Sequence, residues 1–320
     1  MYHVIVNPAS KSGRGNRIWE ECQKILNRRQ IPYEVFFSEE FGQIEEHVRR
    51  MTQDPDQFYD ILVFGGDGTM NEVVSGICHL DHVRIGYIPS GSSNDLARDM
   101  EMSVKPTVLM EKILKNEQGY LMDVGCLKFA TVSEEHSCLY NKEHFSGVKR
   151  FNVSCGIGFD AAVCEEALHS KMKEFLNRFK MGKLVYLCIA LKQLIKAKRV
   201  SCDLYLDENE PIHVKGLLFV ACMNHKYEGG GFMFGPDADY QDGFLDLCVV
   251  GNIPKPLILL ALPTAMKGKH FGFPCIEKYR AREVRIKISE SLWVHTDGEV
   301  YVKSDDIYIK NESTKMRMIV

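Results

Sequence analysis

The segment GGDGTMNE at residues 65–72 constrains what this chain can fold into more than any other segment. It directly follows the apolar run 61–64, which is typical of a buried strand, and it leads into the helix-like stretch 73–77. Glycine lets the backbone come close to a ligand, and the N–H groups at the start of a helix face an anion. The order of strand, glycine turn and helix start therefore predicts a phosphate cradle.

Asp67 lies inside this turn, where its negative charge would repel a phosphate. An acid at such a position indicates either a bridging Mg²⁺ or a role in catalysis. The alternative is a tight strand–helix turn in which Asp67 or Thr69 only caps the helix. The segment by itself leaves both interpretations open.

The first 120 residues alternate between strand-like and helix-like patterns. The expected strands are 2–6, 32–37, 61–64 and 84–88, and the expected helices are 16–29, 41–51, 70–78 and 108–115. This alternation predicts an α/β domain with a doubly wound parallel sheet. Ligands of such sheets bind outside the carboxyl ends of the strands.

Two more loops fall at that same edge. NPASKSGRG at 7–15 follows the first strand, and PSGSSNDLAR at 89–98 follows the fourth. Small residues, hydroxyls and cations before a helix are suited to phosphate or ribose, although each loop alone could be an ordinary capped turn. Because three such loops meet at one edge, the sequence favours a shared ligand.

The pattern changes after Asp123. Segments 151–157, 200–206, 213–223, 244–250 and 284–288 read as strands with few helices between them, which predicts a mostly antiparallel second domain. We expect an α/β domain at 1–123, completed by 298–320, and a β-rich domain at 124–297. The polar stretch 131–149 is expected to be an inserted loop.

Composition excludes several classes of protein. The net charge of −3 gives no reason to expect nucleic acid binding. Eleven cysteines without a CxxC pair resemble a reduced, cytoplasmic protein. The N-terminal residues lack a signal-peptide pattern, and the longest apolar stretches are too short to span a bilayer, so any membrane contact is expected at the surface.

Together with the late DGE motif at 297–299, the three loops resemble the diacylglycerol kinase catalytic-domain superfamily. More narrowly, they are similar to bacterial soluble lipid kinases of the diacylglycerol kinase B and YegS type. DGE alone is commonly a hairpin turn, and GGDGT alone is shared with NAD kinases. The ordered set of motifs, which spans residues 7–299, carries the resemblance.

The resemblance implies an ATP- and Mg²⁺-dependent lipid kinase that phosphorylates a lipid hydroxyl, with diacylglycerol giving phosphatidic acid as the first expectation. The first domain would bind ATP and the second the lipid. Matching the motifs residue by residue gives the expected nucleotide contacts: Asn7, Pro8, Ala9, Ser10, Lys11, Ser38, Gly65, Gly66, Asp67, Gly68, Thr69, Met70, Asn71, Glu72, Ser92 and Asp95.

The same resemblance assigns the catalytic acids and the metal ligands. Asp297 is the expected general base, Asp67 is the second choice, and Glu299 joins the acidic cluster. A carboxylate beside a lipid hydroxyl can accept its proton during attack on the phosphate. The expected metal ligands are Asp123, Asp239, Asp242 and Phe244, the last through its backbone, although Gln241 departs from the family's acidic turn.

The segment 171–199 is rich in Lys and Arg, has Glu174 as its one acid, and interleaves apolar residues. Such a segment predicts contact with an anionic membrane surface, and its alternative is a core helix with a solvated basic face. The expected partner is thus a membrane lipid at the bilayer surface, and a homodimer is left open.

Three rival functions are weighed against this reading. An NAD kinase-like phosphotransferase would share GGDGT but would not need the basic apolar segment. A kinase of another lipid (a sphingoid base, a polyprenol or phosphatidylglycerol) would use the same chemistry on a different tail. A binding protein without catalysis would have no need of Asp67, Asp95 and Asp297 together.

Overall fold

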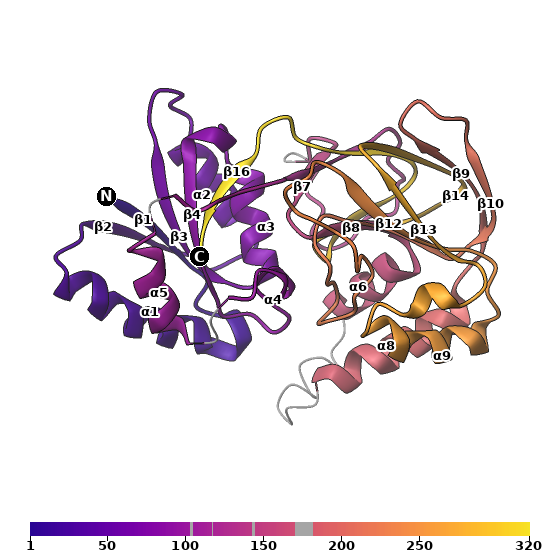
Figure 1. Ribbon diagram of the computed structural model, residues 1–320, viewed down its shortest axis with the longest axis horizontal. Helices are drawn as coiled ribbons and strands as arrows, with labels where there is room; N and C mark the ends of the chain where they lie inside the picture. Colours follow the sequence, from indigo (N-terminus) through magenta and orange to yellow (C-terminus); the bar gives the residue numbers. More distant parts are fainter. Residues whose placement is uncertain (103–104, 117, 143–144, 170–181) are drawn as a thin grey trace.

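The computed structural model describes residues 1–102, 105–116, 118–142, 145–169 and 182–320, apart from the side chains of 11–12, 169 and 182–187. Two sheets lie next to each other along the long axis of the molecule (Figure 1). The amino-terminal residues build the first sheet, and the rest of the chain builds the second. One strand from the carboxyl-terminal region returns to the first sheet.

The first sheet has the strand order β2-β1-β3-β4-β16-β5. Its strands are β1 Tyr2–Val6, β2 Tyr33–Phe37, β3 Tyr59–Gly65, β4 Val83–Pro89, β5 Tyr120–Met122 and β16 Met316–Ile319. Neighbouring strands are parallel except β5, which runs antiparallel to β16. The carboxyl ends of β1, β3 and β4 therefore meet at one edge.

Helices cover both faces of this sheet because alternate strand residues point to opposite faces and both sets are apolar. In β1, Val4 and Val6 pack toward one helix layer and Ile5 toward the other. The helices of this domain are α1 Ser10–Arg28, α2 Gln43–Met51, α3 Asp67–Gly76, α4 Asp95–Asp99 and α5 Pro106–Ile113, with the 3-10 turn η1 Leu80–His82. Helices α1 and α5 share one core, and α2 and α3 share the other.

The second sheet follows the path β13-β12-β11-β8-β14-β15-β6-β7, with β9 added to β14 and β10 to β9. Its pairings are antiparallel. The strands are β6 Gly125–Phe129, β7 Val148–Phe151, β8 Ser154–Gly158, β9 Val200–Leu206, β10 Ile212–Leu217, β11 Phe219–Met223, β12 Leu245–Val250, β13 Ile276–Ala281, β14 Glu283–Thr296 and β15 Glu299–Asn311.

The helices of the second domain are α6 Phe159–His169, α8 Gly182–Lys196 and α9 Lys255–Ala265, with the 3-10 turn η2 His270–Gly272. Strand β11 shows how the sheet separates two apolar cores. Val220 and Cys222 join the core of the strands, whereas Ala221 and Met223 face the core that includes Leu194 of α8 and residues of α9. Helices α8 and α9 therefore cover one face of this sheet.

This architecture confirms the predicted fold class of a parallel α/β domain followed by an antiparallel β-rich domain. Two local expectations differ from the structure. Helix α1 begins at Ser10 and not at residue 16, so the second half of the first loop is helical. The stretch expected as an inserted loop is irregular over its described residues before β7, and it packs on the second sheet where His136 bridges Val302 and Ser137 bonds the Val300 carbonyl.

The second difference concerns residues 298–320, which we expected to complete the first domain and of which only the last strand does so. Strand β15 belongs to the second sheet because it forms a long hairpin with β14, and β16 alone enters the first sheet between β4 and β5. Figure 1 shows the chain that leads into β16 passing from the second domain to the first. The chain therefore passes between the domains twice.

Candidate functional site

The three loops predicted to share a ligand are hydrogen-bonded to one another. The Asn7 side-chain amide donates to Thr69 Oγ1 at 3.1 Å, and the hydroxyls of Ser10 and Ser90 lie 2.7 Å apart. The Ser90 N–H also donates to the Gly65 carbonyl at 2.7 Å. These contacts arise because parallel strands β1, β3 and β4 end side by side, so the turns that follow them are neighbours.

Two glycines allow the second and third loops to approach. A Cβ added at Gly66 would lie 3.0 Å from the Cα atom of Gly91, and a Cβ added at Gly91 would lie 2.5 Å from the Cα atom of Gly66. Any side chain at these positions would separate the loops. The glycines therefore hold a tight, backbone-lined edge at the start of α3, which is the arrangement that binds phosphate groups.

Asp67 is the first residue of α3 and faces the third loop. Its carboxylate accepts the N–H groups of Asp95 at 3.1 Å and Leu96 at 3.4 Å, which lie at the start of α4. Burial, together with the nearby carboxylate of Asp95, raises the pKa of Asp67 to about 7. Burial also raises the pKa of Asp95, although the Gly230 N–H and the Arg98 guanidinium both act to lower it. One buried and one partly buried acid at the same edge form a site that favours either a proton or a cation.

Asp297 lies in the turn between β14 and β15, in the left-handed region with φ 51°. Its Oδ1 accepts the N–H groups of Val153 at 2.8 Å and Ser154 at 3.0 Å. Its Oδ2 accepts the Asn152 N–H at 2.8 Å, the Asn152 amide at 3.3 Å and the Asn71 amide at 2.9 Å. Two carboxylate oxygens offer about four lone-pair sites, so these five donors fill them. In this geometry Asp297 joins the domains and has no lone pair left for a substrate proton.

Glu299 follows the same turn and reaches the glycine-rich segment. A Cβ added at Gly68 would collide with Glu299 Oε1, so the Glu299 carboxylate rests directly on the first turn of α3. The DGE motif of the second domain thus meets the GGDGT motif of the first. This places Asp67, Asp297 and Glu299 around the same interdomain contact.

Several other expected nucleotide contacts lie elsewhere. Met70 is fully buried in the core between α3 and the sheet. The Glu72 carboxylate accepts the Gly42 N–H at 2.7 Å at the start of α2, and burial raises its pKa to about 7. Ser38 and Ser92, in contrast, follow the carboxyl ends of β2 and β4. The side chain of Lys11 lies outside the described part. Met70 and Glu72 therefore support the fold and do not face the loop edge.

The expected metal turn is held together by the chain itself. Asp242 accepts the Phe244 N–H at 2.8 Å and pairs with Arg280, while Asp239 accepts the Gln241 N–H at 3.0 Å. Asp123 accepts the Gly243 N–H at 2.7 Å and pairs with Lys315 Nζ at 3.0 Å. Side-chain cations thus already meet the charge of Asp123 and Asp242. The Mg²⁺ expected at this turn therefore stays a prediction, in which the cation would have to displace these side-chain ion pairs.

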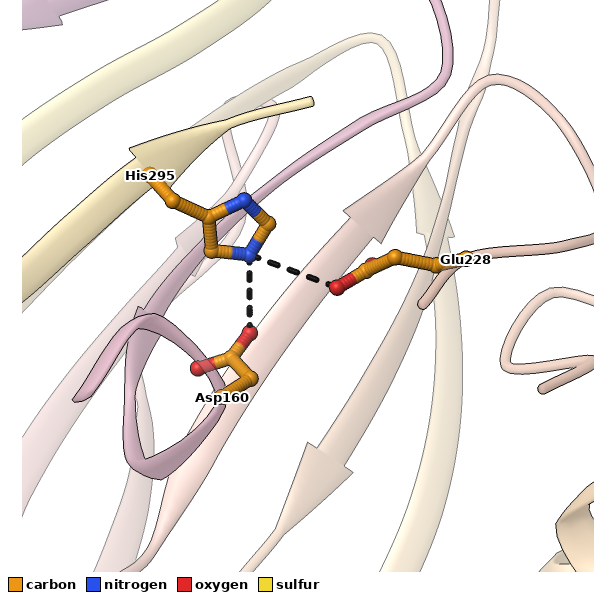
Figure 2. Close-up of side chains that lie close together, drawn as sticks. All are labelled: Asp160, Glu228 and His295. Atoms are coloured by element: carbon orange, nitrogen blue, oxygen red, sulfur yellow. Dashed lines mark hydrogen bonds and ion pairs between the residues drawn. The ribbon is translucent and has the colours of Figure 1, made fainter. Parts of the chain in front are cut away.

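A buried cluster that the motif analysis did not select lies behind the DGE turn. His295 Nε2 is 3.1 Å from Asp160 Oδ2 and 3.4 Å from Glu228 Oε1, and the histidine is fully buried (Figure 2). Asp160 comes from the start of α6 and Glu228 from the loop before β12. A Cβ added at Gly156 would strike both Asp160 Oδ2 and His295 Nε2, so glycine at 156 makes the room for this cluster.

The cluster has the donor types of a metal site, but its hydrogen bonding argues otherwise. The Gly298 N–H donates to His295 Nδ1 at 3.2 Å, so Nδ1 is the acceptor nitrogen and the ring proton sits on Nε2. A metal on Nε2 would need the opposite tautomer. Burial lowers the pKa of His295, but the Glu228 and Asp160 carboxylates outweigh burial and raise that pKa above its usual value. Because Nδ1 has no room for a proton, we place any extra proton on Glu228, whose pKa burial raises to about 7.

The loop that carries Glu228 also reaches the first domain. Glu228 and Phe232 exchange backbone hydrogen bonds of 2.8 and 3.0 Å, which closes a loop of three glycines with positive φ. At its tip the Gly230 N–H donates to Asp95 Oδ2 at 2.7 Å. One loop thus connects the His295 cluster to the acids beside the nucleotide-binding edge.

Sequence reasoning could have found part of this cluster. His295 stands two residues before Asp297 in the same motif, and Asp160 directly follows the glycine-rich strand β8 at a helix start. Glu228 gave no comparable signal. Its partners are more than sixty residues away in the chain, so its position follows from tertiary structure alone.

Among the described residues, no helix has the length and apolar character needed to cross a bilayer. Residues 171–181 of the basic segment 171–199, which was expected to meet the membrane, lie outside the described residues.

Two family models match the chain in succession. The model described as "Diacylglycerol kinase catalytic domain" matches residues 1–126, and that described as "YegS C-terminal NAD kinase beta sandwich-like domain" matches residues 153–306. The first match contains the three loops, and the second contains Asp160, Glu228 and Asp297. Both match in the order that the sequence motifs predicted.

Curated relatives and solved structures agree with these matches. The chain is 27% identical over 306 residues to a Bacillus subtilis protein named "Putative lipid kinase YtlR", covering 93% of each. It is 24% identical over 297 residues to a diacylglycerol kinase of Staphylococcus carnosus, covering 92% of this chain and 87% of that one. The fold is similar to that of a diacylglycerol kinase from Bacillus anthracis, with a TM-score of 0.67, 19% identity and coverage of 99% and 96%. An NAD kinase of Archaeoglobus fulgidus is a more distant fold neighbour, with a TM-score of 0.52, 16% identity and coverage of 100% and 94%. Sequence motifs, site geometry and relatives together show that the chain belongs to the bacterial diacylglycerol kinase and YegS family of lipid kinases.

Proposed function

We propose that this lipid kinase transfers the γ-phosphate of ATP to the free hydroxyl of diacylglycerol at a membrane surface, giving phosphatidic acid. The observation that carries the proposal is the meeting of the three loops around Asp67, opposite the DGE motif. Relatives named diacylglycerol kinase support the choice of acceptor. A sphingoid base, a polyprenol or phosphatidylglycerol would use the same chemistry and is tested alongside.

We assign the proton acceptor to Asp67 and not to Asp297, which was the first expectation. Asp297 already accepts five hydrogen bonds, so it cannot take a proton without releasing the contact between the domains. Asp67 accepts two longer bonds, and its pKa of about 7 is matched to a base that works near neutral pH.

The acids at this edge fit a catalytic Mg²⁺. Asp67 is partly buried and Asp95 is buried beside Arg98, the pKa values of both are raised, and hard oxygen ligands suit this cation. Mg²⁺ bound beside them would screen the phosphate oxygens of ATP. The chain's own part is to hold the phosphates on the backbone of the three loops and to place Asp67 next to the acceptor hydroxyl.

The test is transfer of radiolabelled phosphate from ATP to a panel of acceptors in detergent micelles. The panel holds diacylglycerol, the three other lipid classes and NAD. Labelled phosphatidic acid as the main product is the expected result. Labelling of NAD with no lipid product would overturn the proposal, and a different labelled lipid would replace diacylglycerol as the acceptor.

A further inference from the structure

Helix α9 exposes an apolar face. Its outward residues recur every three or four positions, and they are Pro256, Leu259, Leu260, Pro263 and Met266. Leu260 is 62% exposed and Leu259 is 42% exposed. The opposite face is buried through Ile258, Ala261 and Ala265, so the helix is apolar on both sides. A helix of this kind at a protein surface marks a contact with another apolar phase.

The end of α8 extends this face. Ile195 is 78% exposed and Leu191 is 37% exposed. The Lys255 ammonium at the start of α9 donates to the Ile195 carbonyl at 2.7 Å, and Leu194 and Ile258 share one core. Figure 1 shows the two helices next to each other on the outside of the second domain. Together they form what we call the α8–α9 face, defined by Leu191, Ile195 and the five outward residues of α9.

The charges carried by the two stretches that form this face all have one sign. The stretches 182–200 and 253–273 contain no Asp or Glu, whereas the chain as a whole carries a net charge of −3. The cations of the two stretches whose side chains are described are Lys192, Lys196, Lys198, Arg199, Lys255, Lys267 and Lys269. Glu166 pairs with Lys192 and Glu290 with Lys198, and both acids come from outside the two stretches. An apolar face with basic flanks is complementary to an anionic lipid surface.

The face continues into the catalytic region. The Met233 N–H donates to the Ala265 carbonyl at 2.9 Å, and a Cβ added at Gly231 would lie 3.6 Å from Met266 Cε. Gly231 adjoins Gly230, which donates to Asp95. The end of α9 therefore lies against the glycine loop that touches the acids of the nucleotide-binding edge.

We propose that the α8–α9 face is the surface on which this enzyme rests on a bilayer that contains anionic lipids, with Leu259 and Leu260 entering the acyl boundary. The inference rests on the proposed function, because a kinase of membrane lipids must reach its acceptor at the bilayer. A second copy of the chain is a poorer occupant. A two-fold contact through this face would bring two sets of lysines together, and neither of the two stretches supplies an acid to oppose them.

The test is co-sedimentation of the full chain with vesicles of phosphatidylcholine containing about one third phosphatidylglycerol, and with phosphatidylcholine alone. We expect the double substitution L259D/L260D to reduce binding to the mixed vesicles at least tenfold. The matched control is F58D, which alters an exposed apolar residue of the first domain, 74% exposed. Unchanged binding of L259D/L260D, or equal loss in F58D, would overturn the proposal.

The flanking charges give a second measurement. K255Q/K267Q is expected to weaken binding to the mixed vesicles severalfold and to flatten its dependence on salt, while leaving the weak binding to pure phosphatidylcholine unchanged. An unaltered salt dependence would contradict the electrostatic part of the proposal. Sedimentation velocity measures the oligomeric state and so distinguishes a membrane contact from a contact with a second copy. If the wild type is a dimer and L259D/L260D is a monomer, the face belongs to a second copy and the proposal is overturned.

Activity separates this inference from the proposed function. With a short-chain diacylglycerol dispersed in detergent, L259D/L260D is expected to keep wild-type turnover, and on vesicles it is expected to lose most of it. Absence of lipid phosphorylation by the wild type in detergent would sink the proposed function while leaving the vesicle-binding result interpretable. Equal loss of turnover in both assays would instead count against the docking face.

Discussion

The side-chain amide of Asn71 donates a hydrogen bond to the Asp297 carboxylate at 2.9 Å, which joins α3 of the first domain to the β14–β15 turn of the second. Asn71 also donates to the Arg150 carbonyl at 3.1 Å. The aspartate completes the joint through the N–H groups of residues 152–154. Two motifs that are more than two hundred residues apart in the chain thus hold one interdomain contact.

Asp297→Asn is expected to loosen this joint. An amide keeps one acceptor oxygen but turns its NH₂ group toward backbone donors, and an unmatched buried group costs about 1–3 kcal/mol. Urea unfolding should therefore show a lower free energy of unfolding. Asn71→Ala, which removes one donor only, should cost less. Full stability of Asp297→Asn together with lost turnover would return the role of base to Asp297.

Asp67→Asn is expected to abolish turnover while leaving the fold intact. Its carboxyl pKa is raised to about 7, so in the wild type the base gains a proton as the pH falls through 7. The rate kcat should therefore fall below about pH 7 and level off above it. A rate that does not change between pH 5.5 and 8 would argue against this assignment, as would substantial activity of Asp67→Asn.

Gly156→Ala is expected to disturb the His295 cluster. The new methyl group would meet Asp160 and His295, both held in place, and such overpacking costs about 1–3 kcal/mol. The control is Gly272→Ala, because a Cβ there meets no atom within 4 Å. Thermal unfolding of the two variants measures the difference. Equal melting temperatures would mean that the cluster readily rearranges.

Glu72→Gln is expected to change how stability depends on pH. The folded pKa of Glu72 is raised from 4.5 to about 7, so the folded protein binds this proton more tightly than the unfolded chain does. This proton's stabilising contribution is complete below about pH 4.5 and is lost as the pH rises to about 7. The free energy of unfolding of the variant, relative to wild type, should therefore rise from pH 4.5 to pH 8 by up to about 3 kcal/mol. A constant difference between the two proteins would contradict a buried, protonated Glu72.

The sequence was sufficient to predict that the loops after β1, β3 and β4 share an edge, because parallel strands bring their carboxyl ends together. It could also have separated Asp67 and Asn71 from Glu72, since residues four apart share a helix face and residues five apart do not. The five donors on Asp297 could not be foreseen, because most are backbone groups that any residue carries. Nor could the ion pairs at the expected metal turn, which Arg280 and Lys315 supply from distant parts of the chain.

Strand β16 lies between β4 and β5, parallel to the first and antiparallel to the second. During synthesis, the first sheet must therefore wait for residues 316–319, which emerge after the whole second domain. Until then β4 is an open edge and β5 has no neighbour in the sheet order. A ribosome-bound fragment that ends before β16 would hold the phosphate-binding loops on an incomplete sheet, so nucleotide binding should begin only once the crossing strand has been inserted.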